Sequence, residues 1–132
     1  MRHFTIKELV RSETARRLGI DNTPPASAVT ALNALVDHVL DPLRDTWGGP
    51  IRVNSGYRCP ELNKAVGGTP TSQHQRGEAA DITVGSRSGN RRLLALNKQL
   101  DLPVDQCIDE KNCRWIHVSH RTGRNRRLYM KF

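Results

Sequence analysis

The sequence has few aromatic residues and few cysteines. Phe, Trp and Tyr make up 5% of the chain, and no run of Lys and Arg is interleaved with them, as a surface that stacks single-stranded nucleic acid requires. The three cysteines, Cys59, Cys107 and Cys113, are odd in number and form no CxxC pair. This argues against a disulfide framework and against a cysteine-based zinc site, and we expect free thiols from a reducing compartment.

The sequence also has no long hydrophobic run. The N-terminus shows no apolar stretch of the signal-peptide kind, and no segment approaches the roughly 20 apolar residues of a membrane helix. We therefore expect a protein that is made in the cytoplasm, has no membrane-spanning segment, and stays in the cytoplasm until something releases it.

The composition that is present indicates one folded domain with an excess of positive charge. A single core commonly serves roughly 100–200 residues, so we expect one domain over residues 1–132. Apolar residues amount to 36% and fall in periodic segments, as in a globular fold. Lys and Arg number 21 against 13 Asp and Glu, a net charge of +8. This charge favours a polyanionic partner, whether nucleic acid, anionic lipid or an anionic cell-wall polymer.

The N-terminal third shows helical patterns. Thr5 and Glu8 have the spacing of a capping box, which predicts a short helix over residues 6–10, followed by a second over 14–18. Apolar residues then recur at helical spacing from Ala26 to Leu43. Pro42 is expected to kink this main helix or to end its regular part.

Strand patterns dominate the rest of the chain. Apolar residues alternate in segments 51–55, 80–84, 104–108 and 115–119, and 126–132 is a candidate edge strand. Segments 104–108 and 115–119 are expected to pair as a hairpin, and Ser88 is expected to cap a helix that runs through Leu100. Segment 56–77 is polar and glycine-rich, without a predicted element. The order predicts an α+β domain with a small, mainly antiparallel sheet packed against helices.

Three residues form a candidate zinc site. His74 leaves a loop and Asp81 follows on a strand, with Gly77 between them to permit a chain reversal. Alternation in segment 115–119 places His117 on the face opposite the core, where it is expected to meet the other two. Three protein ligands leave a fourth zinc position open for water, which is the arrangement of a catalytic zinc site rather than a structural one.

These residues resemble the zinc D-Ala-D-Ala carboxypeptidase family, peptidase family M15, whose hallmark is Ser-x-His-x-x-Gly-x-Ala-x-Asp with a later Trp-x-His. The positions that match are Ser72, His74, Gly77, Ala79, Asp81, Trp115 and His117. The segment Ser55-Gly56-Tyr57-Arg58 also resembles a Ser-Gly-Tyr-Arg segment of that family. The resemblance runs from about Ile6 to Arg121.

The resemblance implies a fold, a cofactor and an activity. The fold would be of the hedgehog and DD-peptidase type, with Zn²⁺ as cofactor held by His74, Asp81 and His117. The substrate would be a peptidoglycan stem peptide, cleaved by a D-Ala-D-Ala carboxypeptidase or by an endopeptidase like the related phage L-alanyl-D-glutamate endolysins. Arg58 would help hold the substrate and polarise its carbonyl, and the further substrate contacts would be Ser72, Tyr57 and Trp115.

The sequence departs from this pattern at the general base. Several members of the family carry an acid three residues before the last histidine, but Arg114 stands there, and a guanidinium does not accept a proton at working pH. Glu110, at the end of the preceding strand, is our first candidate for the base, ahead of Glu78 and His120. The alternative is a non-catalytic, zinc-containing module that binds the cell wall and has lost its base.

Each candidate also has an ordinary structural interpretation. A lone histidine is most often a solvated loop residue, as we expect for His3 and His38, and Asp81 could cap a turn. Arg58 could be a surface cation, Ser72 a loop residue, Tyr57 a packing residue and Trp115 part of the core. The arginines near the C-terminus form either a solvated basic rim or a surface that attracts an anionic wall polymer: Arg121, Arg124, Arg126 and Arg127.

The wider context follows from the resemblance and from the lack of an export signal. A small wall peptidase without a signal peptide fits a phage or prophage gene, whose product reaches the wall by release from the cell or as part of a virion. We expect a monomer that binds a peptidoglycan peptide. A nucleic-acid-binding protein is a third hypothesis, which only the net charge favours.

Overall fold

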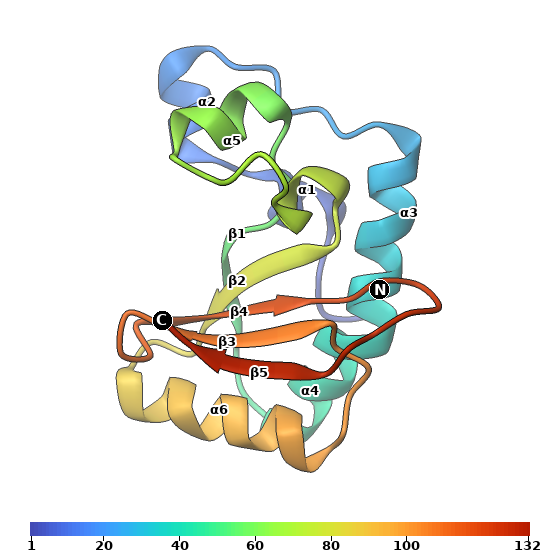
Figure 1. The fold of residues 1–132 in the computed structure, drawn as a ribbon, viewed down its shortest axis with the longest axis vertical. Coiled ribbons are helices and arrows are strands. Elements are labelled where there is room, and N and C mark those ends of the chain that lie inside the picture. The colour runs from blue at the N-terminus through green and yellow to red at the C-terminus, as the bar shows by residue number, and fades with distance from the viewer.

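A five-stranded sheet is the centre of the computed structural model, which describes residues 1–132 (Figure 1). Its strands are β1 (Arg52–Ser55), β2 (Ala79–Thr83), β3 (Gln106–Glu110), β4 (Trp115–Ser119) and β5 (Leu128–Lys131). Their order across the sheet is β1-β2-β4-β3-β5. Every neighbouring pair is antiparallel except β3 and β5. The predicted α+β class with a mainly antiparallel sheet is confirmed, including the β3–β4 hairpin and the edge strand β5.

Helices lie at both ends of the molecule, with the strands between them. In Figure 1, α4 and α6 lie at one end, and α2 and α5 at the other. The helical segments are α1 (Ile6–Val10), α2 (Glu13–Leu18), α3 (Ala26–Leu35), the π-helical η1 (Val36–Leu40), α4 (Asp41–Trp47), α5 (Pro60–Ala65), the 3₁₀ turn η2 (Gln73–Arg76) and α6 (Arg87–Gln99). None of the helices combines the length and the apolar character needed to cross a membrane.

The predicted main helix is a composite of α3, η1 and α4. Pro42 has no N–H and its ring would collide with the carbonyl four residues earlier, so a regular α-helix cannot pass through it. The wider π turn precedes Pro42, and Asp41 N donates to Val36 O across it. The α-helix then resumes with Pro42 in its first turn. The expected effect of Pro42 is confirmed.

The core lies between this composite helix and one face of the sheet. The helix contributes Leu32, Leu35, Val39 and Leu43, all fully buried. The sheet contributes the alternating residues of three strands: Val53, Ala80, Ile82, Ile116 and Val118. Because successive strand residues point to opposite faces, this core face leaves Asp81 and His117 on the other face, as predicted.

One helix begins at a different residue from the one predicted, and one helix was not predicted. The N-cap of α6 is Ser86, whose hydroxyl accepts from Gly89 N at 3.0 Å, so the predicted cap at Ser88 is wrong. Ser86 has the extended backbone that a cap needs, whereas Ser88 already lies in the first turn. Helix α5 was not predicted within segment 56–77, although Pro60 at its start is a helix signal in the sequence.

Candidate metal centre

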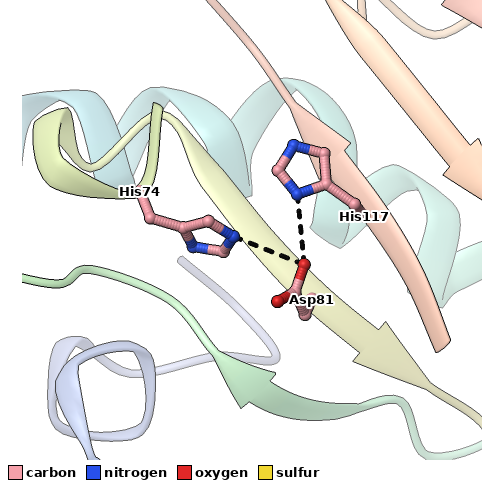
Figure 2. Close-up of side chains that lie close together, drawn as sticks. All are labelled: His74, Asp81 and His117. Atoms are coloured by element: carbon pink, nitrogen blue, oxygen red, sulfur yellow. Dashed lines mark hydrogen bonds and ion pairs between the residues drawn. The ribbon is translucent and has the colours of Figure 1, made fainter. Parts of the chain in front are cut away.

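His74, Asp81 and His117 converge on one face of the sheet. The register of β2 and β4 sets Asp81 directly opposite His117, and η2 brings His74 to the same place. One carboxylate oxygen, Asp81 Oδ1, lies 3.1 Å from His117 Nδ1 and 3.3 Å from His74 Nε2 (Figure 2). One donor atom from each residue lies within 4.8 Å of the other two. The three side chains that the sequence predicts as metal ligands are therefore brought together.

The hydrogen bonding of His74 fixes which of its nitrogens is free. Its Nδ1 lies 2.7 Å from Gly56 O, and since a carbonyl only accepts, Nδ1 carries the proton. The lone pair is then on Nε2, which faces Asp81. A metal-binding histidine needs this arrangement, in which the outer nitrogen donates to a carbonyl and the inner one is free. His74 is 3% exposed, so the interpretation as a solvated loop histidine is wrong.

Asp81 is held as a carboxylate. Burial by itself would raise the pKa of Asp81, but its interactions with the imidazoles of His117 and His74 outweigh burial and keep the pKa below its usual range. The side chain is 13% exposed, so a ligand still reaches it. One anionic oxygen between two imidazoles is a local charge that favours a divalent cation.

The donor set matches zinc, and so do its two nitrogen-to-oxygen spacings. Ligand atoms about 2 Å from a tetrahedral zinc are separated from one another by roughly 3.3 Å. The two nitrogen-to-oxygen distances, 3.1 and 3.3 Å, are of that size. Two imidazoles and a carboxylate are ligands that zinc accepts, and three of them leave one tetrahedral position open.

Arg58 lies beside the three ligands and is held from three sides. Its Nε donates to Ser55 Oγ at 3.0 Å, its Nη1 to Asn63 Oδ1 at 3.1 Å, and its Nη2 lies 3.4 Å from Asp81 Oδ2. The side chain is 15% exposed, so Arg58 is not an ordinary surface cation. Burial lowers the pKa of Arg58, and the charge of Asp81 acts against that shift. Two of its five N–H groups have no partner in the protein.

Glu110 shares a hollow with His117. This hollow, which we call the Glu110 hollow, has a volume of about 530 Å³ and is also lined by Ser72, Gln73 and Arg121. Glu110 lies opposite Trp115 in the β3–β4 register, and His117 lies opposite Ile108. Glu110 and His117 are therefore diagonal neighbours on one sheet face, a separation that long side chains span. The geometry agrees with Glu110 as the first candidate for the base, and this role stays a prediction.

The two weaker candidates for the base have partners elsewhere. Glu78 accepts from Arg76 Nε at 2.9 Å. His120 is buried, with its Nδ1 2.6 Å from Pro103 O and its ring stacked on that of His38. Arg114 is exposed in the turn between β3 and β4 and does not line the Glu110 hollow.

The predicted substrate contacts occupy different places. Ser72 lines the Glu110 hollow, and its hydroxyl also accepts from His74 N at 3.2 Å, so it shapes the loop that carries His74. Trp115 is partly exposed on the metal face, where it lines a second hollow. Tyr57 is 5% exposed and belongs to the core cluster, which favours the packing interpretation. All three substrate contacts stay predictions.

Sequence reasoning missed two residues that position the site. Gly56 accepts from His74 through its carbonyl, and Asp105, fully buried, accepts from the Gln73 side chain at 3.2 Å. Arg126 donates to the same carboxylate at 2.8 Å. The family-like motif includes Gly56 but does not reveal that its carbonyl binds His74. Asp105 could not be identified from the sequence, because its partners Gln73 and Arg126 lie 32 and 21 residues away.

The cysteines and Gly77 match their predictions. Cys59, Cys107 and Cys113 are free thiols, and burial raises the pKa of Cys107 to about 12 and that of Cys113 to about 11. Gly77 has a φ of +72°, which allows the predicted reversal between His74 and Asp81.

Two comparisons with known proteins agree with this geometry. Residues 2–119 match the family model described as Peptidase M15. Over an aligned segment of 88 residues, this chain is 45% identical to the zinc D-Ala-D-Ala carboxypeptidase of Streptomyces albus G. The aligned segment covers 64% of this chain. The match spans about a third of that protein, 32% of its length.

Proposed function

The chain belongs to the peptidase M15 family, and on this premise we propose that it is a zinc metallopeptidase that hydrolyses a peptide bond in the stem peptides of bacterial peptidoglycan. The observation that carries the proposal is the convergence of His74, Asp81 and His117, with Nε2 of His74 left free by its bond to Gly56. The name of the similar Streptomyces protein supports both the metal and the substrate class.

The roles of the protein groups follow from their positions. When bound by His74, Asp81 and His117, zinc supplies Lewis-acid polarisation of the scissile carbonyl and lowers the pKa of the attacking water. Glu110, in the hollow beside His117, takes a proton from that water and delivers it to the leaving amine. Arg58 donates its two free N–H groups to the carbonyl oxygen as negative charge develops there.

The positions of Ser55 and Asn63 support the role of Arg58. Both hold the guanidinium before any substrate arrives, so its direction is set in advance. Gly68 is part of this arrangement, because a Cβ there would lie 2.1 Å from Asn63 Oδ1. A lysine at position 58 would keep the charge but lose the planar fork that makes these contacts.

The test combines metal analysis with hydrolysis. The purified chain is loaded with zinc and incubated with peptidoglycan, and newly exposed amines and termini are identified by mass spectrometry. We expect His74→Ala to lose both zinc and activity. Glu110→Gln should retain zinc and lose about 10²–10⁴-fold in kcat, the usual contribution of a general base.

A matched control separates the base from a general effect of charge. Glu78→Gln removes an acid from the metal motif, but that acid is paired with Arg76, and we expect wild-type kcat. Zinc bound without any release of peptidoglycan termini would contradict the peptidase. Co-sedimentation with cell walls in the same samples would then support the alternative, the non-catalytic wall-binding module.

The products also distinguish finer activities. Release of a terminal D-alanine indicates a carboxypeptidase, and cleavage within the stem indicates an endopeptidase of the endolysin type. Our proposals of a phage or prophage origin, synthesis in the cytoplasm and action on the wall after release rest on the family membership and on the sequence. A monomer stays a prediction that size-exclusion chromatography with light scattering checks.

A further inference from the structure

Three arginines line a second hollow on the molecule. This arginine hollow has a volume of about 540 Å³, and its lining includes Arg52, Arg87, Arg114, Asn54, Thr83 and Trp115. No acidic residue lines it. None of the three arginines has a carboxylate within 4.0 Å, so no side chain of the protein neutralises them there.

The arginine hollow begins next to the metal ligands. Thr83 lies two residues beyond Asp81 on β2, and Trp115 lies two residues before His117 on β4, so alternation puts them on the metal face. Arg52 lies opposite Thr83 in the β1–β2 register and is exposed. The hollow therefore follows the metal centre along the same strands, while the Glu110 hollow extends across β3 on the same face.

The charge of the arginine hollow favours a counter-charge. Three guanidinium groups around one small volume repel one another, and solvent relieves this only in part. An oxyanion between them would exchange repulsion for charge-assisted hydrogen bonds, which guanidinium forms with carboxylate and phosphate in the same planar geometry.

We propose that the arginine hollow binds an oxyanion of the substrate, a carboxylate or a phosphate, adjacent to the scissile bond. The inference rests on the proposed function for the identity of the substrate. It gives Arg114 a role: at the position where several relatives carry an acidic base, this chain carries a cation that recognises substrate charge. The base is then supplied from Glu110, which lies on the neighbouring strand β3 opposite Trp115 and lines the Glu110 hollow.

The test is a titration of the zinc-loaded chain followed by NMR at Gly85 N–H and the Trp115 indole. Two probes are compared: a pentapeptide ending in D-Ala-D-Ala with one free internal side-chain carboxyl, and the same peptide with that carboxyl as an amide. Glu110→Gln is the background, which keeps the peptides intact. We expect about fivefold tighter binding of the acidic peptide, the gain of a partly exposed arginine–carboxylate contact.

Charge-neutral variants locate the effect. Arg87→Gln and Arg114→Gln should each remove the preference for the acidic peptide. Arg17→Gln, on the exposed surface of α2 away from the hollow, lowers the net charge equally and should leave the preference unchanged. The altered side chains are all exposed, so the variants should keep the wild-type melting temperature, which is measured alongside.

The two sources of oxyanion give different results. If inorganic phosphate shifts the same NMR signals in an Arg114-dependent manner while the two peptides bind equally, the ligand is a phosphate and the proposal holds. If binding of the acidic peptide and binding of phosphate are both unaffected by the Arg87 and Arg114 variants, the proposal is wrong. Failure of hydrolysis by the wild-type zinc protein would contradict the proposed function alone, because the titration does not measure turnover.

Discussion

Gly56 supports the metal centre without supplying a ligand. A Cβ at this position would lie 2.1 Å from Leu9 O, and the carbonyl of the same residue accepts from His74 Nδ1. We predict that Gly56→Ala pushes the backbone away from α1 and shifts that carbonyl. Zinc affinity should fall about 10–100-fold, as for other losses of the hydrogen bond that orients a metal-binding histidine. Competition titration against a zinc-chelating dye measures it.

A second glycine provides the control for Gly56. At Gly49 an added Cβ would meet only Trp47 side-chain atoms, the nearest at 3.6 Å, which is ordinary contact. We expect Gly49→Ala to retain wild-type zinc affinity and nearly wild-type stability. Wild-type zinc affinity in Gly56→Ala would show that the Gly56 carbonyl does not set the orientation of His74.

The convergence of the three candidate metal ligands could be predicted from the sequence, whereas the residues that position them could not. Asp81 and His117 need only strand alternation to reach the metal face, and the motif connects them with His74. Gly56 is required because α1, far away in sequence, contacts it through Leu9. Such contacts between distant segments leave no periodic pattern in the sequence.

At the scale of elements, strands with clear alternation and the short helices α1 and α2 were predicted well, whereas helix α5 was missed. The segments of β1, β2, β3 and β4 were located to within two residues, because their apolar residues define a core face. Helix α5 was missed because its six residues contain a single buried apolar side chain, Leu62. The parallel pairing of β5 could not be predicted from the sequence. After β4, the chain crosses to the far edge of β3, and β5 pairs with β3 there.

Asp105 joins three elements and gives a pH-dependent prediction. Its carboxylate accepts from Gln73 of η2 and from Arg126 before β5, and it immediately precedes β3. The hydrogen bond from Arg126 outweighs burial and lowers the pKa of Asp105 to about 2, against roughly 3.9 unfolded. Because the pKa of Asp105 is lower in the folded protein than in the unfolded one, the carboxylate stabilises the folded protein at pH values above the unfolded pKa. This stabilisation is lost as the pH falls from about 4 towards 2.

Replacing Asp105 by asparagine should therefore lower the melting temperature only where the carboxylate is charged. We expect Asp105→Asn to melt about 4 °C below wild type at pH 6, with the difference shrinking as the pH falls from 4 to 2. Asp101→Asn removes an 81% exposed carboxylate that contacts Arg127 and should change nothing measurable. Calorimetry at several pH values checks both, and a difference that persists at pH 2 would contradict the assigned pKa.

At the scale of the whole molecule, we expect the net charge of +8 to govern attraction to an anionic wall polymer but not the binding of zinc. Charges on the surface act over a Debye length, about 10 Å at 0.1 M salt and about 3 Å at 1 M. The ligands of the metal centre lie within 4.8 Å of one another and are largely buried. Salt should therefore weaken attraction to an anionic wall polymer far more than it weakens zinc binding.

We predict that the fraction of protein that sediments with cell walls falls steeply between 0.1 and 1 M NaCl, equally for wild type and Glu110→Gln. Hydrolysis of a short peptide without net charge should change less than about twofold over the same range, because it needs no long-range attraction. Parallel sedimentation and peptide assays measure the two quantities. If association with the wall does not depend on salt, specific contacts hold the protein there and the basic surface has another purpose. Salt-sensitive DNA binding that survives removal of zinc would then support the nucleic-acid hypothesis.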